Sequence, residues 1–119
     1  MPIVEVEFVG EQSPNLAAQA LADTLGTAFG SESGQTWVRF RHLPRDSYAE
    51  NGAPIEEDQL PVFVQILHAR PPAGAALATE LAAVTQAVAK FTGRGTAQVH
   101  VEYAPAGAGR QAFGGQLVK

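Results

Sequence analysis

PIVEVEFV at residues 2–9 and PVFVQIL at residues 61–67 are the two stretches of this 119-residue chain that decide its fold. The first alternates around Val4, Val6 and Phe8, which is the pattern of a strand with one buried face. The second is predicted to be a strand as well, and its proline stands 59 positions after the proline of the first. The chain therefore carries two related strands, and the same order of elements follows each of them.

A helix and a further strand are expected after each of these strands. Ser13 resembles an N-cap before Pro14 at the first helical position, and apolar residues recur at helical spacing across 16–29. In the second half, Pro71-Pro72 is predicted to open a helix that Gly93 ends. The first helix is expected to end at Gly30 through Gly34, and the two further strands are expected at 37–42 and 98–103.

Two βαβ repeats result from this order, at about residues 1–52 and 61–119, with a linker at 53–60. A helix between two strands of one sheet requires a parallel pair with a right-handed crossover. We predict one α+β domain over residues 1–119, a tandem βαβ repeat that forms a four-stranded mixed sheet with both helices on one face. The other face needs a cover. Because 21 residues are alanine and bury little surface, we expect that cover to be another copy of the chain.

Composition argues against several functional classes. A net charge of −4 argues against a nucleic-acid partner, and no run approaches the ~18 apolar residues of a membrane span. Without cysteine, the chain has no disulfide, no thiolate nucleophile and no cysteine zinc site. The three histidines lack metal-ligand spacing, so no metal site is expected. The first residues do not resemble a signal peptide, which predicts a cytoplasmic protein.

Charge is distributed unevenly along the chain. Residues 1–38 contain five acidic side chains and no basic one, whereas three of the six arginines follow within the next few positions.

Three short motifs occur in order within the duplicated chain. These are PIV at 2–4, VRF at 38–40 and FGGQLV at 113–118. In these motifs the chain resembles the tautomerase superfamily. This is the group of 4-oxalocrotonate tautomerase, 5-carboxymethyl-2-hydroxymuconate isomerase and macrophage migration inhibitory factor. The doubled length is similar to members that fuse two short units and form trimers.

The resemblance implies that Met1 is removed and that Pro2 becomes the catalytic amine. A free N-terminal proline is a secondary amine, and a partly dry pocket lowers its pKa because desolvation disfavours the cation. The neutral amine can then take a proton from a carbon beside a carbonyl group and return it elsewhere. The alternative interpretation of Pro2 is a rigid start to an edge strand. Pro61 lies inside the chain, where its nitrogen is an amide, so each chain can have one such amine.

The resemblance also implies substrate-binding residues. Arg39 matches an arginine that binds substrate in short tautomerases, and Arg70 follows the third strand at about the place of another. His100 aligns with Arg39 in the repeat and can donate a hydrogen bond or titrate there. Tyr48 and Phe113 are candidate aromatic residues of the pocket. The alternatives are an exposed strand charge for Arg39, a loop charge for Arg70, and packing in the core or an interface for the two aromatic residues.

The predicted function is that of a cofactor-independent tautomerase or isomerase. We expect a homotrimer that acts on a small carboxylate substrate, a 2-hydroxydienoate or 2-oxo acid of the kind found in aromatic-compound breakdown. One alternative is a dehalogenase, hydratase or decarboxylase of the same superfamily, which needs a group such as Glu50 or Glu102 to activate water. Another is an inactive trimeric scaffold or binding module, because retention of Met1 acylates Pro2.

Overall fold

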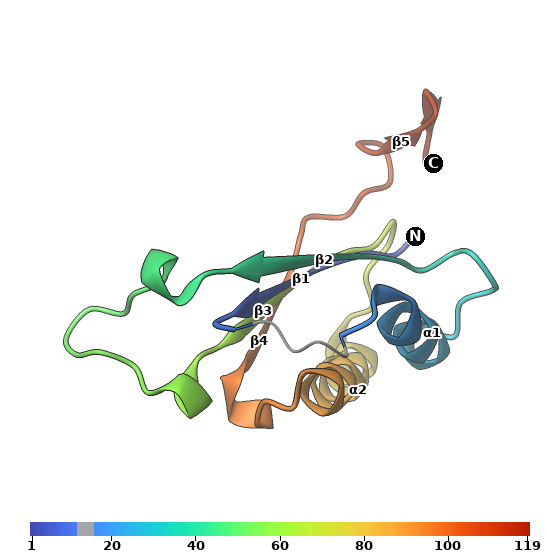
Figure 1. Cartoon of the computed structure of the whole chain (residues 1–119). Helices are drawn as coiled ribbons and strands as arrows, with labels where there is room; N and C mark the ends of the chain where they lie inside the picture. Colours follow the sequence, from blue (N-terminus) through green and yellow to red (C-terminus); the bar gives the residue numbers. More distant parts are fainter. Residues whose placement is uncertain (12–15) are drawn as a thin grey trace.

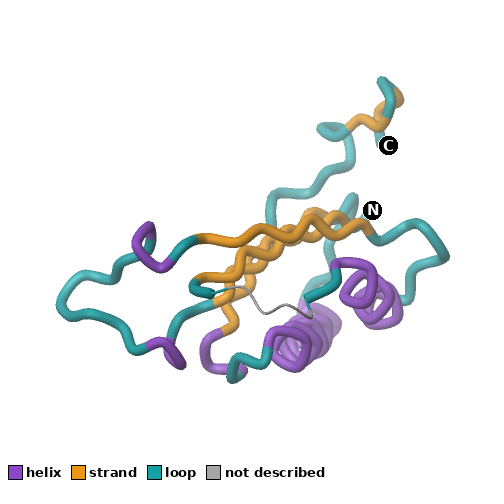
Figure 2. The backbone as a smooth tube through the Cα atoms, in the orientation of Figure 1, coloured by secondary structure: helices purple, strands orange, loops and turns teal. Residues whose placement is uncertain are grey.

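A four-stranded sheet with two helices packed on one of its faces forms the body of the protein (Figures 1 and 2). The computed structural model describes residues 1–11 and 16–119. Its main elements are β1 (Ile3–Val9), α1 (Ala18–Phe29), β2 (Trp37–Leu43), β3 (Val62–Leu67), α2 (Gly74–Thr92) and β4 (Val99–Tyr103). This order confirms the predicted strand–helix–strand arrangement in each half of the chain.

The strands lie in the order β2-β1-β3-β4. The pairs β1–β2 and β3–β4 are parallel, whereas the central strands β1 and β3 run antiparallel to each other. Each parallel pair is joined by one helix, which is the connection that a parallel pair requires. The structure therefore confirms a mixed α+β sheet with both helices on one face, the fold class that the sequence predicts.

The core lies between this sheet and the helices, and every second side chain of β1 points into it. Val4 and Val6 are completely buried, whereas the intervening residues of β1 are partly accessible from the other face. The helices contribute fully buried leucine and valine side chains to the same core. These are Leu21 and Leu25 from α1 and Val84 and Val88 from α2. Buried residues recur every two positions in the strand and about every 3.6 positions in the helices, because one face of each element packs against the core.

The helices end where the sequence predicts but begin later. Gly30 and Gly93 adopt left-handed φ values of 63° and 74° at the two C-termini, a conformation that glycine enters without steric cost. The expected cap at Ser13 and Pro14 lies outside the described residues. The helix α1 begins only at Ala18, so the prediction that Leu16 is helical is wrong.

The prediction that Pro71-Pro72 opens the second helix is also wrong, because α2 begins at Gly74. Proline disfavours the helical region for the residue before it, which keeps Pro71 out of a helix when Pro72 follows. Ala73, directly before the helix, is extended as well, with a φ of −135°. The two prolines therefore belong to the loop that leads from β3 to α2.

A C-terminal arm of residues 104–119 leaves the body beyond β4. It carries a small hairpin, β5 (Ala112–Phe113) and β6 (Gln116–Leu117), which forms a separate two-stranded sheet. In Figure 1 the hairpin lies on the opposite side of the sheet from the helices. Backbone hydrogen bonds attach the base of the arm to the body, from Ala104 N to Ile66 O, from Gly107 N to His68 O and from Ala108 N to Ala69 O.

Arg94 joins the two halves of the chain at the other end of the sheet. Its guanidinium donates hydrogen bonds to the carbonyl oxygens of Leu60 at 2.5 Å and Val9 at 2.9 Å. The same group lies 4.2 Å from the ring centroid of Phe8. Burial lowers the pKa of Arg94 below its ordinary value, but guanidinium groups remain charged in proteins. One side chain therefore holds together the end of β1 and the start of β3.

Candidate functional site

Pro2 lies at the end of the sheet where β1 begins. It is buried, and its carbonyl oxygen accepts a hydrogen bond of 3.0 Å from the backbone nitrogen of Trp37. Met1 is half-buried and packs beside the base of the C-terminal arm. A Cβ atom added at Gly107 would stand 2.6 Å from the methyl group of Met1, at the far end of a flexible side chain. The start of the chain and the base of its own arm are therefore in close contact.

Three other predicted site residues lie toward this same end of the sheet. Arg39 is an exposed residue of β2, paired in register with Glu5. Arg70 is exposed and follows the C-terminal end of β3, which lies beside the start of β1 because these strands are antiparallel. The ring of Phe113 packs against that of Trp37 with a centroid distance of 4.9 Å. Pro2, Arg39, Arg70 and Phe113 therefore belong to one region of the molecule.

Tyr48 and His100 lie toward the opposite end of the sheet. Both rings pack against Phe63, with centroid distances of 5.9 Å for Tyr48 and 5.7 Å for His100. Phe63 is paired with Glu7 of β1, five residues beyond Pro2, which corresponds to roughly 17 Å along an extended strand. One chain therefore does not bring these two residues to Pro2.

A hydrogen bond within its own loop raises the pKa of Tyr48. Its hydroxyl donates to Glu50 at 2.5 Å, and this bond, together with partial burial and the negative charge of Glu50, raises the pKa of Tyr48 to about 12. Hydrogen bonding to the carboxylate stabilises the neutral phenol over the phenolate. Tyr48 thus remains a hydrogen-bond donor at neutral pH, but its proton is already directed to a residue of its own loop.

Arg39 is already paired within the chain. Its Nη2 atom lies 2.8 Å from Oε1 of Glu5, and Nη2 of Arg41 lies 3.4 Å from the other oxygen of the same carboxylate. Sequence reasoning missed this pairing, although the parallel register of β1 and β2 dictates it. Beside the pair is a small hollow of about 180 Å³, lined by Ile3, Glu5, Arg39, Gln65, Leu67, Ala104 and Gln111.

A second missed group is a partly buried cluster of His68, Glu80 and Tyr103. Nε2 of His68 lies 2.9 Å from the Glu80 carboxylate, and the Tyr103 hydroxyl donates a short hydrogen bond to the same oxygen. Burial, with the bond to Glu80, raises the pKa of Tyr103 above its ordinary value. The partners come from β4, α2 and the residue after β3, so no local sequence pattern identifies the cluster.

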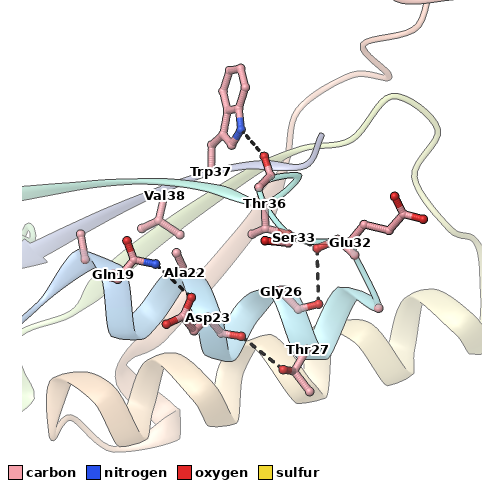
Figure 3. A pocket seen from close by; sticks show the side chains of 14 residues that line it. Gln19, Ala22, Asp23, Gly26, Thr27, Glu32, Ser33, Thr36, Trp37 and Val38 are labelled. Carbon is pink, nitrogen blue, oxygen red and sulfur yellow. Dashed lines mark hydrogen bonds between the residues drawn. The ribbon is translucent and has the colours of Figure 1, made fainter.

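A wider hollow, of about 890 Å³, lies elsewhere, between α1, the loop that follows it and the start of β2 (Figure 3). Asp23 and Glu32 are the charged side chains among the described residues that line it. Gln19 donates a hydrogen bond of 3.0 Å to Asp23, and the indole nitrogen of Trp37 donates one of 2.9 Å to Gly34. An acidic hollow of this kind does not suit a carboxylate ligand.

Residues 1–11 and 16–119 contain no cluster of three or more histidine, aspartate and glutamate side chains that could hold a metal ion. Within that part of the chain, no helix combines the length and the apolar character that crossing a membrane demands.

No protein-family model and no curated protein sequence matches the chain. Several solved structures do match. A fused 4-OT, described as a symmetric trimer, aligns with a TM-score of 0.79 at 14% identity over 98% of this chain and 94% of its own. The protein Pt0534, described as inactivated by 2-oxo-3-pentynoate, aligns with a TM-score of 0.79 at 13% identity over 98% of this chain and 94% of its own.

A macrophage migration inhibitory factor homologue from Prochlorococcus marinus also aligns, with a TM-score of 0.75 at 9% identity over 98% of this chain and 99% of its own. These matches span nearly the whole length of both partners. The chain therefore has the fold of the tautomerase superfamily, as the resemblance implied. Among its neighbours, the fused 4-OT shares both this fold and nearly the full length of the chain.

Proposed function

We propose that this chain is a cofactor-independent tautomerase or isomerase of small carboxylate compounds, with the amine of Pro2 as its base. The observation that supports this most is the burial of Pro2 at the start of β1, in a fold shared with a fused 4-OT. Arg39 and Arg70 belong to the same end of the sheet. Arginine suits this site because its planar group binds carboxylates through paired hydrogen bonds.

In the proposed reaction, the neutral amine takes a proton from the 2-hydroxyl group of a 2-hydroxydienoate, or from the carbon beside the carbonyl group of a 2-oxo acid. The electron pair left behind is shared between the oxygen and the carbon chain as an enolate or dienolate. Arginine stabilises this developing negative charge, and the protonated amine returns the proton to a different atom of the substrate. One proton changes place, no electrons are gained or lost overall, and the reaction therefore balances without a cofactor.

We further propose that the active form is a homotrimer. The sheet face opposite the helices carries alternating residues such as Arg39, Phe63 and His100, and the exposed fraction of Phe63 is 37%. Because Tyr48 and His100 lie far from Pro2 within one chain, they can contribute to its site only from a neighbouring copy. Three structural neighbours are described as trimers of fused 4-OT, which supports this arrangement.

A second candidate function is that of a binding module without catalysis. Met1 packs half-buried against the region of Gly107, and while it is attached the nitrogen of Pro2 is an amide. An amide nitrogen has no basicity, so this form cannot perform the proposed proton transfer.

The test begins with the intact mass of the purified protein, which shows whether Met1 is present. Processed protein is then assayed with phenylenolpyruvate, 2-hydroxymuconate and 3-chloroacrylate. We expect turnover of an enol substrate that is lost in Pro2→Ala. The matched control is Pro61→Ala, which changes the equivalent proline of the second half and leaves the base intact.

A chemical probe tests the base directly. The compound 2-oxo-3-pentynoate has an electrophilic alkyne, and we expect it to add to the Pro2 nitrogen and increase the mass of the N-terminal peptide. Turnover of the haloacrylate alone would contradict the isomerase assignment. Retention of Met1 together with absence of labelling and turnover would instead support the binding module.

A further inference from the structure

Glu5 lies between two arginines on the uncovered face of the sheet. Its carboxylate oxygens are 2.8 Å from Arg39 and 3.4 Å from Arg41. The exposed fraction of the Glu5 side chain is 24%, whereas those of the two arginine side chains are 64% and 58%. Within one chain the carboxylate is therefore held beneath the more exposed guanidinium groups, and in the proposed trimer an anion meets these arginines first where the neighbouring copies leave this end of the sheet open.

The charges of this arrangement determine how much negative charge it can accept. Two guanidinium groups and one carboxylate sum to +1, so one further carboxylate neutralises the group. On the other side of Glu5, β3 supplies the neutral Gln65, which donates a hydrogen bond of 3.1 Å to Glu102. Glu7 and Glu102 add two negative charges to the same face and bring the sum of these five side chains to −1. Each carboxylate of a ligand therefore increases an excess of negative charge, and a dicarboxylate increases it twice as much as a monocarboxylate.

The position of Glu5 also relates it to the proposed base. Glu5 is three residues after Pro2 on the same strand, which corresponds to roughly 10 Å. Glu5 and Arg39 both line the small hollow at this end of the sheet. A five-carbon 2-oxo acid is roughly 5 Å long from its first to its last carbon, so with its carboxylate on Arg39 its carbon chain covers about half of the distance toward Pro2.

We propose that Glu5 determines substrate specificity by restricting the Arg39 site to compounds that carry a single carboxylate. This inference rests on the proposed function, in which Arg39 binds the substrate carboxylate. Glu5 repels every carboxylate of a ligand, so a dicarboxylate is repelled twice. At about 8 Å and an effective dielectric constant of about 40, the extra repulsion of the second carboxylate corresponds to roughly a fivefold loss of affinity.

The experiment compares two ligands of the same length, 2-oxopentanoate and 2-oxoglutarate, which differ by one terminal carboxylate. Their equilibrium binding to the processed protein is measured by calorimetry for the original protein and for Glu5→Gln. We expect 2-oxopentanoate to bind more tightly to the original protein. In Glu5→Gln both ligands gain affinity, and the ratio of 2-oxoglutarate to 2-oxopentanoate affinity rises about fivefold.

Two further variants serve as controls. Glu5→Asp keeps the negative charge, so its affinity ratio should stay near that of the original protein. Glu7→Gln removes the same charge from the same face of β1, roughly 7 Å farther along the strand, and should change the ratio by about half as much, roughly two- to threefold. Thermal unfolding curves show whether each variant folds.

Turnover separates this inference from the proposed function. The kcat/KM values of 2-hydroxymuconate and 2-hydroxypenta-2,4-dienoate should show the same shift in ratio as binding does. If binding shifts as expected but neither compound turns over, the proposed function fails and the inference about the carboxylate site stands. An unchanged ratio in Glu5→Gln, an equal shift in Glu7→Gln, or no binding of either 2-oxo acid overturns the inference.

Discussion

Replacement of Arg94 by alanine is expected to destabilise the protein more than any change at an exposed arginine. The guanidinium donates to the carbonyl oxygens of Leu60 and Val9, two residues whose exposed fractions are 2% and 0%. It also stacks over Phe8 at 4.2 Å. Alanine leaves both carbonyl groups without this donor, at the point where the two halves of the chain meet.

The magnitude is the sum of these contacts. A hydrogen bond to a charged group contributes about 1.5–3 kcal/mol, and we take the lower value because Arg94 is only half-buried. The cation–π contact adds about 0.5 kcal/mol. We therefore expect the free energy of unfolding to fall by about 3.5 kcal/mol, which corresponds to a fall of about 1.5–2 M in the urea midpoint. Lysine in Arg94→Lys can keep a hydrogen bond to one of the two carbonyl oxygens, so the free energy of unfolding should fall by about half as much.

The assay is urea unfolding followed by circular dichroism at one fixed protein concentration, because subunit association would add to the apparent stability. Arg110→Ala, an exposed arginine in the C-terminal arm, is the control and should change the free energy by less than about 0.5 kcal/mol. A loss below about 1 kcal/mol in Arg94→Ala would show that water replaces the guanidinium without cost, which refutes the reasoning.

Three other results are expected. The only tyrosines, Tyr48 and Tyr103, both have a raised pKa, so the native protein should show no phenolate absorbance near pH 10. A tyrosine whose pKa is raised by folding adds stability below about pH 10, and this added stability is lost as the pH rises toward the pKa in the folded protein. Deprotonation of tyrosine in the native protein at pH 10 would contradict the hydrogen bonds described. Glu80→Gln should lower the free energy of unfolding by about 1–3 kcal/mol, measured in urea, because two hydrogen bonds to a carboxylate weaken. Phe113→Ala should shift the fluorescence of Trp37, the only tryptophan, to longer wavelength, and no shift would mean that the arm does not cover the indole.

Much of the fold follows from patterns within short stretches of the sequence. Alternation around Val4 and Val6 identifies the buried face of β1, and glycine at positions 30 and 93 identifies both helix ends. Both helices begin later than predicted. In α2 the reason is that Pro72 disfavours the helical conformation for Pro71, and this effect outweighs the general tolerance of helices for proline near their first turn.

The candidate site was less predictable. The sequence identifies Pro2 and Arg39 as residues of interest, but it does not show that Glu5 already binds Arg39, nor that Tyr48 and His100 lie toward the other end of the sheet. Their placement depends on which residues pair across strands, and pairing between distant segments has no local periodicity.

The sequence by itself determined which residues form strands and helices, which strand faces turn inward, and that each half is a parallel βαβ unit, since periodicity, glycine and crossover geometry act within one segment. Only the tertiary structure decided that the two central strands are antiparallel and that Arg94 connects the halves. It also decided that Glu5 shares the arginines of the uncovered face. These contacts form because the whole chain must bury one core, which sets the register of segments that lie far apart in sequence.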